Sequence, residues 1–99
     1  MADYRISNVA KEDLIRIHQY GVKKFGMAQA DKYFHSFISY FEIIAQQAYS
    51  FEAVDYIKKG YRRCVCVADS IYYRIDSSTN TVEIMTITRK QDLNSVFKN

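Results

Sequence analysis

The strongest periodic signal in the sequence lies between residues 28 and 48, where apolar side chains recur every three or four positions. The apolar positions are Tyr33, Phe34, Phe37, Ile38, Phe41, Ile44, Ala45 and Ala48. This spacing predicts an α-helix with one apolar stripe, while Lys32, His35 and Glu42 fall on its polar side. A helix of this kind is stable only when its stripe is buried, so the chain must supply a second layer against it.

A second helical stripe precedes this one. Ser7 or Asn8 offers an N-cap, and apolar residues then recur at helical spacing through Leu14 and Ile17 to Phe25. Gly26 is a natural end, because glycine accepts the left-handed conformation of a helix C-cap. Very few residues separate the two stripes, which predicts an antiparallel helical hairpin.

The rest of the chain favours strands. Alternation predicts a short strand over residues 3–7 and three more over residues 61–68, 71–75 and 81–88. Turn-type residues at Asp69-Ser70 and at 77–80 predict an antiparallel meander, and residues 49–60 form a connection without clear period. The prediction is an α+β fold of order β-α-α-β-β-β, with a four-stranded antiparallel sheet packed on the helical hairpin, in a single domain over residues 1–99. Leu93, Val96 and Phe97 indicate a short terminal helix or an ordered tail.

One sheet face is predicted to stay open, because two helices in so short a chain cover only the other. Alternation places Tyr72, Met85 and Ile87 on this open face among charged residues. An apolar strip on a wet face is typical of a protein-binding surface.

Charge is unevenly distributed. Residues 1–56 carry six basic and seven acidic groups, whereas residues 57–99 carry eight basic and four acidic groups. A basic C-terminal half suits an acidic protein segment or a nucleic acid, and the bias does not choose between them.

Several classes of protein are not indicated. The N-terminus lacks a basic and apolar leader, and no apolar run approaches the length of a membrane span. Cys64 and Cys66 are interpreted as small buried thiols of a reducing compartment, so we expect a cytoplasmic protein. His18 and His35 are too far apart in the sequence to indicate a metal site, and no cofactor is expected.

Several short stretches, in order, resemble the ParE toxins of the RelE/ParE superfamily. They are Tyr4-Arg5-Ile6-Ser7, Asp13-Leu14 with Ile17 and Tyr20, Phe25-Gly26, Gln29-Ala30 with Tyr33, Gly60-Tyr61-Arg62, Ile71-Tyr72-Tyr73-Arg74, and Val82-Glu83-Ile84 with Ile87 and Arg89. The resemblance covers residues 4–89. It implies a toxin of a type II toxin–antitoxin system that inhibits DNA gyrase by binding and is not an enzyme.

The resemblance also implies a ParD-like antitoxin as partner and a hetero-oligomer with it. It implies no direct nucleic-acid specificity of this chain, since DNA binding in ParE systems belongs to the antitoxin. A disordered antitoxin segment that folds on binding would use the apolar strip and nearby arginines. The candidate antitoxin-binding residues are Arg62, Tyr72, Arg74, Met85, Ile87 and Arg89.

The alternative is a ribosome-dependent mRNA interferase, since related RelE-type toxins cleave mRNA. Such cleavage requires a general base, a general acid and cations. Arg62, Arg63, Arg74 and Arg89 could supply the cations, but the predicted strands carry no histidine. A third interpretation is an inactive member that is retained only as a binding partner.

Overall fold

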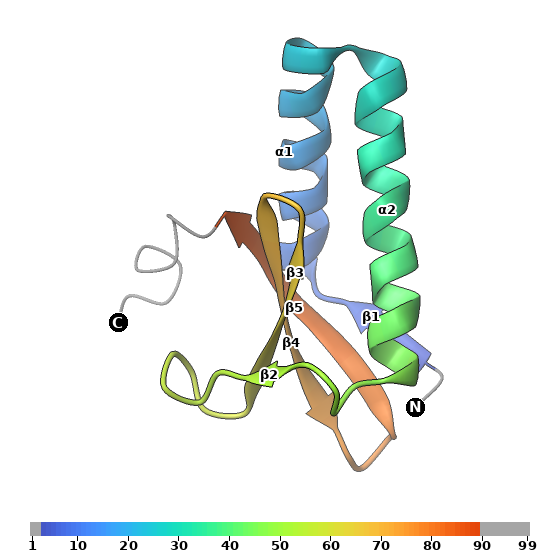
Figure 1. Cartoon of the computed structure of the whole chain (residues 1–99). Helices are drawn as coiled ribbons and strands as arrows, with labels where there is room; N and C mark the ends of the chain where they lie inside the picture. Colours follow the sequence, from blue (N-terminus) through green and yellow to red (C-terminus); the bar gives the residue numbers. More distant parts are fainter. Residues whose placement is uncertain (1–2, 90–99) are drawn as a thin grey trace.

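The computed structural model describes residues 3–89 of the chain. Its elements are β1 (Asp3–Ile6), α1 (Asn8–Phe25), α2 (Met27–Gln46), β2 (Glu52–Ala53), β3 (Tyr61–Cys66), β4 (Asp69–Asp76) and β5 (Thr81–Arg89). The two helices form a hairpin that packs on one face of the sheet and extends beyond it (Figure 1). This confirms the α+β class, the helical hairpin and the meander of the last three strands. The segment expected around residues 93–97 lies outside the described residues.

The sheet differs from the prediction in two respects. It has five strands in the order β1-β5-β4-β3-β2, because the two-residue strand β2 pairs with β3. It is also mixed, because β1 runs parallel to β5 while the other pairs are antiparallel. The alternation of side chains shows that a segment is a strand, but it carries no information about its partner or its direction.

β1 ends before β5 does, and the residues that follow β1 supply hydrogen-bond partners to the rest of β5. The Ser7 hydroxyl accepts the Ala10 N–H at 3.0 Å as an N-cap and donates to the Met85 carbonyl at 2.8 Å. Asp13 Oδ2 accepts the Thr86 hydroxyl at 2.7 Å and the Ile87 N–H at 3.0 Å. These contacts give hydrogen-bond partners to strand groups that lie beyond the end of β1.

The main core lies between the helical hairpin and the sheet. Its fully buried side chains include Phe37, Phe41 and Ile44 from α2 and Ile71, Ile84 and Ile87 from the sheet. Cys64 and Cys66 are buried free thiols in the same core, as predicted, and burial raises the pKa of Cys64 to about 11. The apolar stripe of α2 is therefore buried against the sheet, as its spacing predicted.

The prediction that Ile87 lies on the open face is wrong. Tyr73 pairs with Ile84 and Tyr72 pairs with Thr86, so Met85 is an extra residue in β5 and the strand has a β-bulge there. A bulge reverses the side-chain alternation of the residues that follow it. Ile87, with 0% of its surface exposed, therefore points into the main core, while Met85 stays on the other face.

The turn between β3 and β4 also differs from the prediction. It consists of Val67 and Ala68, and Asp69 begins β4, where it accepts the Tyr33 hydroxyl of α2 at 2.7 Å. Val67 adopts a φ of 56°, which a β-branched residue rarely takes, and its side chain is 77% exposed. Valine is therefore strained at the tip of this hairpin.

Replacing Val67 with asparagine should raise the free energy of unfolding by about 1 kcal/mol, because asparagine tolerates the left-handed region. Urea denaturation measures the change. The control is Val65→Asn, which replaces a half-exposed valine in the regular part of β3 and should give no gain. A Val67→Asn protein that is no more stable than the wild type would show that the turn relaxes without strain.

Candidate partner-binding surface

The outer face of the sheet, opposite the helices, is partly covered by the chain itself. The segment between β2 and β3 places Val54 and Ile57 over Tyr72, together with Tyr61 and Met85. Asp55 closes this loop by accepting the Gly60 N–H at 2.7 Å. Tyr72 is consequently 0% exposed, and the apolar strip predicted on this face is largely a second, smaller core.

Arg63 ties this covering segment to the sheet. Its Nη2 donates to both carboxylate oxygens of Glu52, at 2.9 and 3.1 Å, and to the Tyr56 hydroxyl at 3.2 Å. Its Nη1 lies 3.5 Å from the Tyr72 hydroxyl. The pKa of Glu52 is lowered, first by the hydrogen bond from Arg63. Glu52 is therefore held as a carboxylate acceptor rather than poised as a proton donor.

A ladder of charges crosses the lower part of the sheet. Arg5 donates to Glu83 at 3.2 Å and to Asp76 at 3.1 Å, and Arg74 donates to Glu83 at 2.6 Å. These residues come from β1, β4 and β5, where Glu83 pairs in register with both arginines. The ladder connects the N-terminal strand with the meander.

This ladder predicts loss of stability in acid. The pKa of Asp76 is lowered to about 2, mainly by hydrogen bonds from Ser78 and Arg5, and that of Glu83 is lowered first by Arg74. A lowered pKa stabilises the folded state above the ordinary pKa, and this contribution is lost as pH falls through the folded value. The melting temperature should fall between about pH 4 and pH 2.

A D76N/E83Q variant provides the comparison. It should melt below the wild type at neutral pH and lose less stability between pH 4 and pH 2, as measured by circular dichroism. Parallel pH profiles for the two proteins would mean that the ladder does not contribute.

The six candidate residues for antitoxin binding lie in four different places. Arg62 donates to the Phe51 carbonyl at 2.7 Å and packs on the Tyr49 ring, next to the end of α2. Tyr72, Arg74 and Met85 lie on the outer face, of which Tyr72 is buried, Met85 is partly buried and Arg74 is ion-paired. Ile87 is in the main core, and Arg89 borders a groove at the far end of β5.

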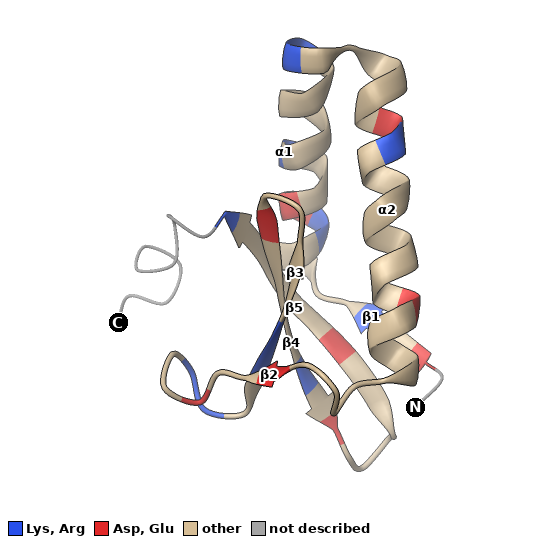
Figure 2. Cartoon of the chain, viewed as in Figure 1, with Lys and Arg blue, Asp and Glu red and all other residues tan. Residues whose placement is uncertain are grey.

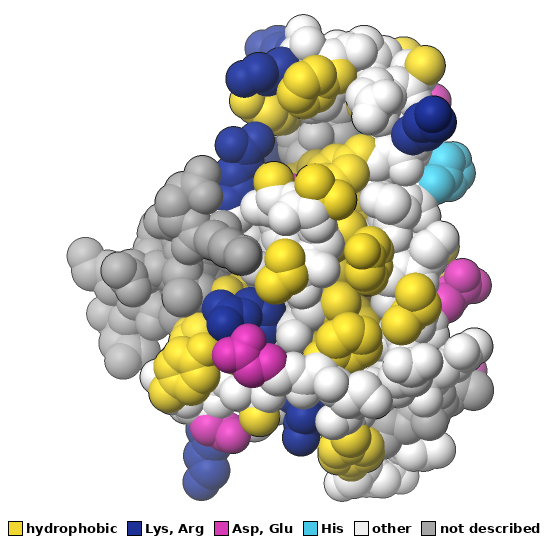
Figure 3. All heavy atoms as spheres, viewed as in Figure 1, with side chains coloured by type: hydrophobic (Ala, Val, Ile, Leu, Met, Phe, Trp, Pro, Cys, Tyr) yellow, Lys and Arg dark blue, Asp and Glu magenta, His cyan; other side chains and the backbone are white. Residues whose placement is uncertain are grey.

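That groove lies between the projecting half of the helical hairpin and the β3–β4 turn. Its volume is about 710 Å³, and it is lined by Arg16, Ile17, Tyr20, Gly21, Phe25, Gln29, Ala30, Tyr33, Val67, Ala68, Asp69 and Arg89. Phe25, Tyr20 and Val67 expose 63%, 43% and 77% of their surfaces. Hydrophobic side chains are visible over the helix pair above the sheet and down the face below it (Figure 3).

Sequence reasoning missed this groove. It exists because the helices continue beyond the end of the sheet. The sides of the helices that point toward the sheet are therefore uncovered in this projecting half. Phe25 belongs to the first helical stripe, so its apolar character was visible, whereas Tyr20 was named only for the resemblance to ParE toxins. Which part of that stripe the sheet covers depends on how far the sheet extends.

Within residues 3–89, no group of three His, Cys, Asp or Glu side chains is arranged to hold a metal ion. Neither helix combines the length and apolar character needed to cross a membrane. His18 Nε2 lies 2.8 Å from Asp31 Oδ1, which joins the two helices of the hairpin.

Comparison with known proteins agrees with this architecture. Residues 4–93 match the family described as "ParE toxin of type II toxin-antitoxin system, parDE". The toxin ParE1 of Caulobacter vibrioides is 28% identical over 85 residues, which cover 86% of this chain and 88% of that protein.

Two solved structures share the fold. A chain of the chromosomal ParDE toxin–antitoxin system from P. aeruginosa superposes with a TM-score of 0.78 at 20% identity, covering 90% of this chain and 96% of its own. A chain of the toxin–antitoxin complex RelBE2 from Mycobacterium tuberculosis gives a TM-score of 0.68 at 14% identity, covering 90% of this chain and 98% of its own.

Proposed function

This chain belongs to the ParE toxin family of type II toxin–antitoxin systems, and on that premise we propose that it inhibits DNA gyrase in the cytoplasm by binding, without chemistry of its own, and is neutralised by a ParD-like antitoxin. The observation that carries the proposal is that carboxylates beside the sheet arginines are ion-paired. Glu52, Asp76 and Glu83 are each held in an ion pair. Their pKa values are lowered, so each of the three is a weaker general base toward a ribose hydroxyl than an unpaired carboxylate would be.

The groove supports the antitoxin part of the proposal. It combines exposed apolar side chains such as Phe25 and Val67 with the guanidinium groups of Arg16 and Arg89 at its border. An amphipathic segment with acidic residues fits such a surface, because its apolar side chains can be buried while its carboxylates meet the arginines. This proposal moves the main contact from the outer sheet face to the groove and keeps Arg89 in it.

A gyrase assay tests the function directly. Purified toxin should inhibit the supercoiling of relaxed plasmid by gyrase, and a molar excess of the cognate antitoxin should restore supercoiling. An equal amount of heat-unfolded toxin serves as the control. Unchanged supercoiling together with ribosome-dependent cleavage of mRNA would replace the proposal with the interferase alternative.

Replacing Phe25 with serine should weaken antitoxin binding at least tenfold, because an exposed aromatic residue that becomes buried is a typical hot spot. The matched control is Ile15→Ser, which alters an equally exposed residue of α1 that does not line the groove. Isothermal titration calorimetry measures both affinities. Equal affinities for the two variants would place the antitoxin elsewhere.

A further inference from the structure

The second half of α1 carries no acidic side chain, although Lys11 lies beside Glu12 in the first half. Glu12 and Asp13 lie in the first half of the helix, whereas residues 16–25 contain Arg16, Lys23 and Lys24 and no carboxylate. Figure 2 shows blue at the far end of α1, and both red and blue in the turns near the sheet. Asp13 accepts hydrogen bonds from β5 and forms an ion pair with Arg16. Within the described residues no ion pair involves Lys23 or Lys24.

These cations form a row with an aromatic ring in its centre. Arg16, Tyr20 and Lys24 are each four residues apart, so they lie on one side of the helix at intervals of about 6 Å. Lys24 Nζ lies 3.2 Å from the Tyr20 hydroxyl and 5.6 Å from the ring centroid. Lys23 stands beside this row in the last turn of the helix.

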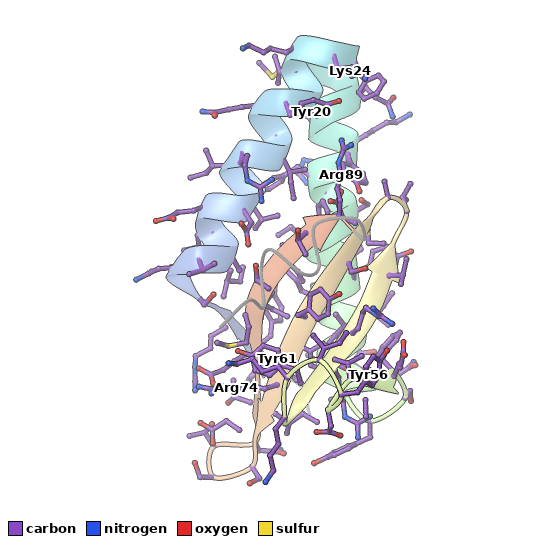
Figure 4. The ribbon with its side chains drawn as sticks, turned by 90° about the vertical axis from the view of Figure 1, so that its left-hand side faces the viewer. Tyr20, Lys24, Tyr56, Tyr61, Arg74 and Arg89 are labelled. Atoms are coloured by element: carbon purple, nitrogen blue, oxygen red, sulfur yellow. The ribbon has the colours of Figure 1, made fainter. Side chains whose placement is uncertain are left out.

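A cation from a distant part of the chain joins the row. The Arg89 guanidinium, at the end of β5, lies 5.0 Å from the centroid of the Tyr20 ring. Figure 4 shows Tyr20, Lys24 and Arg89 together where the helix passes the end of the strand. The pKa of Tyr20 is lowered, first by Lys24 and then by Arg89, which shows that the surroundings favour negative charge.

We propose that Arg16, Tyr20, Lys23, Lys24 and Arg89 form a binding site for the phosphate backbone of a nucleic acid. Four cations grouped around one ring suit the phosphates of a nucleic acid, and an exposed tyrosine can stack on an unpaired base. Lys23 and Lys24 also suit the negative end of the helix dipole, but that role needs neither Tyr20 nor Arg89. Lys23 and Lys24 do not line the apolar groove, and Lys23 instead borders a separate hollow together with Arg16, Tyr20 and Met27.

The proposal is tested with purified toxin alone, so its outcome is independent of gyrase and antitoxin. Fluorescence anisotropy is measured with a labelled DNA duplex and with a labelled single strand of equal length, at several salt concentrations. We expect a dissociation constant on the order of 10⁻⁵ M for the duplex. Tighter binding of the single strand would assign a stacking role to Tyr20.

A K23Q/K24Q variant should weaken binding about tenfold and reduce the slope of log K against log salt by about 2. The control, K11Q/K32Q, removes the same charge from α1 on the side opposite Tyr20 and from α2. Circular dichroism establishes that both variants are folded.

Three results would overturn the proposal. One is absence of binding to either oligonucleotide at 50 mM salt. Another is an equal loss in both variants, which would mean that only net charge matters. The third is a K23Q/K24Q protein that keeps its affinity for DNA but loses affinity for the antitoxin, which would assign the row to an acidic polypeptide.

Discussion

Replacing Ile87 with alanine should destabilise the protein by about 3 kcal/mol, within the range found for fully buried isoleucines. Ile87 is 0% exposed and packs in the main core with Ile71, Ile84 and residues of α2. Truncation removes apolar contacts and leaves a cavity that a sheet packed on two helices fills only in part. Urea denaturation monitored by circular dichroism measures the loss.

Met85→Ala is the matched control, two positions away in the same strand. Met85 is only partly buried, in the small core of the outer face, so its truncation should cost about 1 kcal/mol. The contrast depends on the bulge in β5, which reverses the side on which Ile87 lies. If Met85→Ala proved the more damaging change, the register of β5 would be wrong, and Ile87 would become available for a partner after all.

Replacing Asp13 with alanine should cost about 2–3 kcal/mol, because it leaves the buried Ile87 N–H and the Thr86 hydroxyl without their acceptor. The ion pair of Asp13 with Arg16 adds little, since Arg16 is 60% exposed. The same carboxylate thus joins α1 to the part of β5 that lies beyond β1.

Two variants make the test specific. Asp13→Asn keeps an oxygen acceptor and should lose less stability than Asp13→Ala, while Glu12→Ala alters the neighbouring exposed carboxylate and should have little effect. Native-state hydrogen exchange adds a local measurement, in which the Ile87 amide of Asp13→Ala should exchange faster. An Ile87 amide as protected as in the wild type would indicate another acceptor.

The elements of the fold were largely readable from local patterns. The α2 stripe, the Ser7 cap and the Gly26 stop predict the helical hairpin, and the alternation in residues 61–88 predicts the meander. These signals are local, since each depends on the conformation of a few neighbouring residues. The resemblance to ParE toxins likewise rested on short stretches in the right order, and the family match confirms it.

The candidate surface was less predictable, because the sheet face on which a side chain lies depends on the exact pairing register of its strand. One extra residue at Met85 sends Ile87 from the open face to the core, and alternation counted from the sequence does not show it. The loop of residues 54–60 covers Tyr72, although nothing in its own sequence shows where it folds. Arg62 and Arg63 are adjacent, yet one bonds to backbone near α2 and the other holds Glu52.

The sequence by itself determined the two helices and the four longer strands, since capping, glycine conformation and apolar period are properties of neighbouring residues. Strand β2 has only two residues and is defined by its pairing with β3. The tertiary structure alone decided which of these residues are accessible. Burial and charge pairing depend on contacts between distant segments, as when Arg89 at the end of the last strand meets Tyr20 of the first helix. This contact depends on how far the helices extend past the end of the sheet. The relative extent of helices and sheet is fixed only when the two layers pack together.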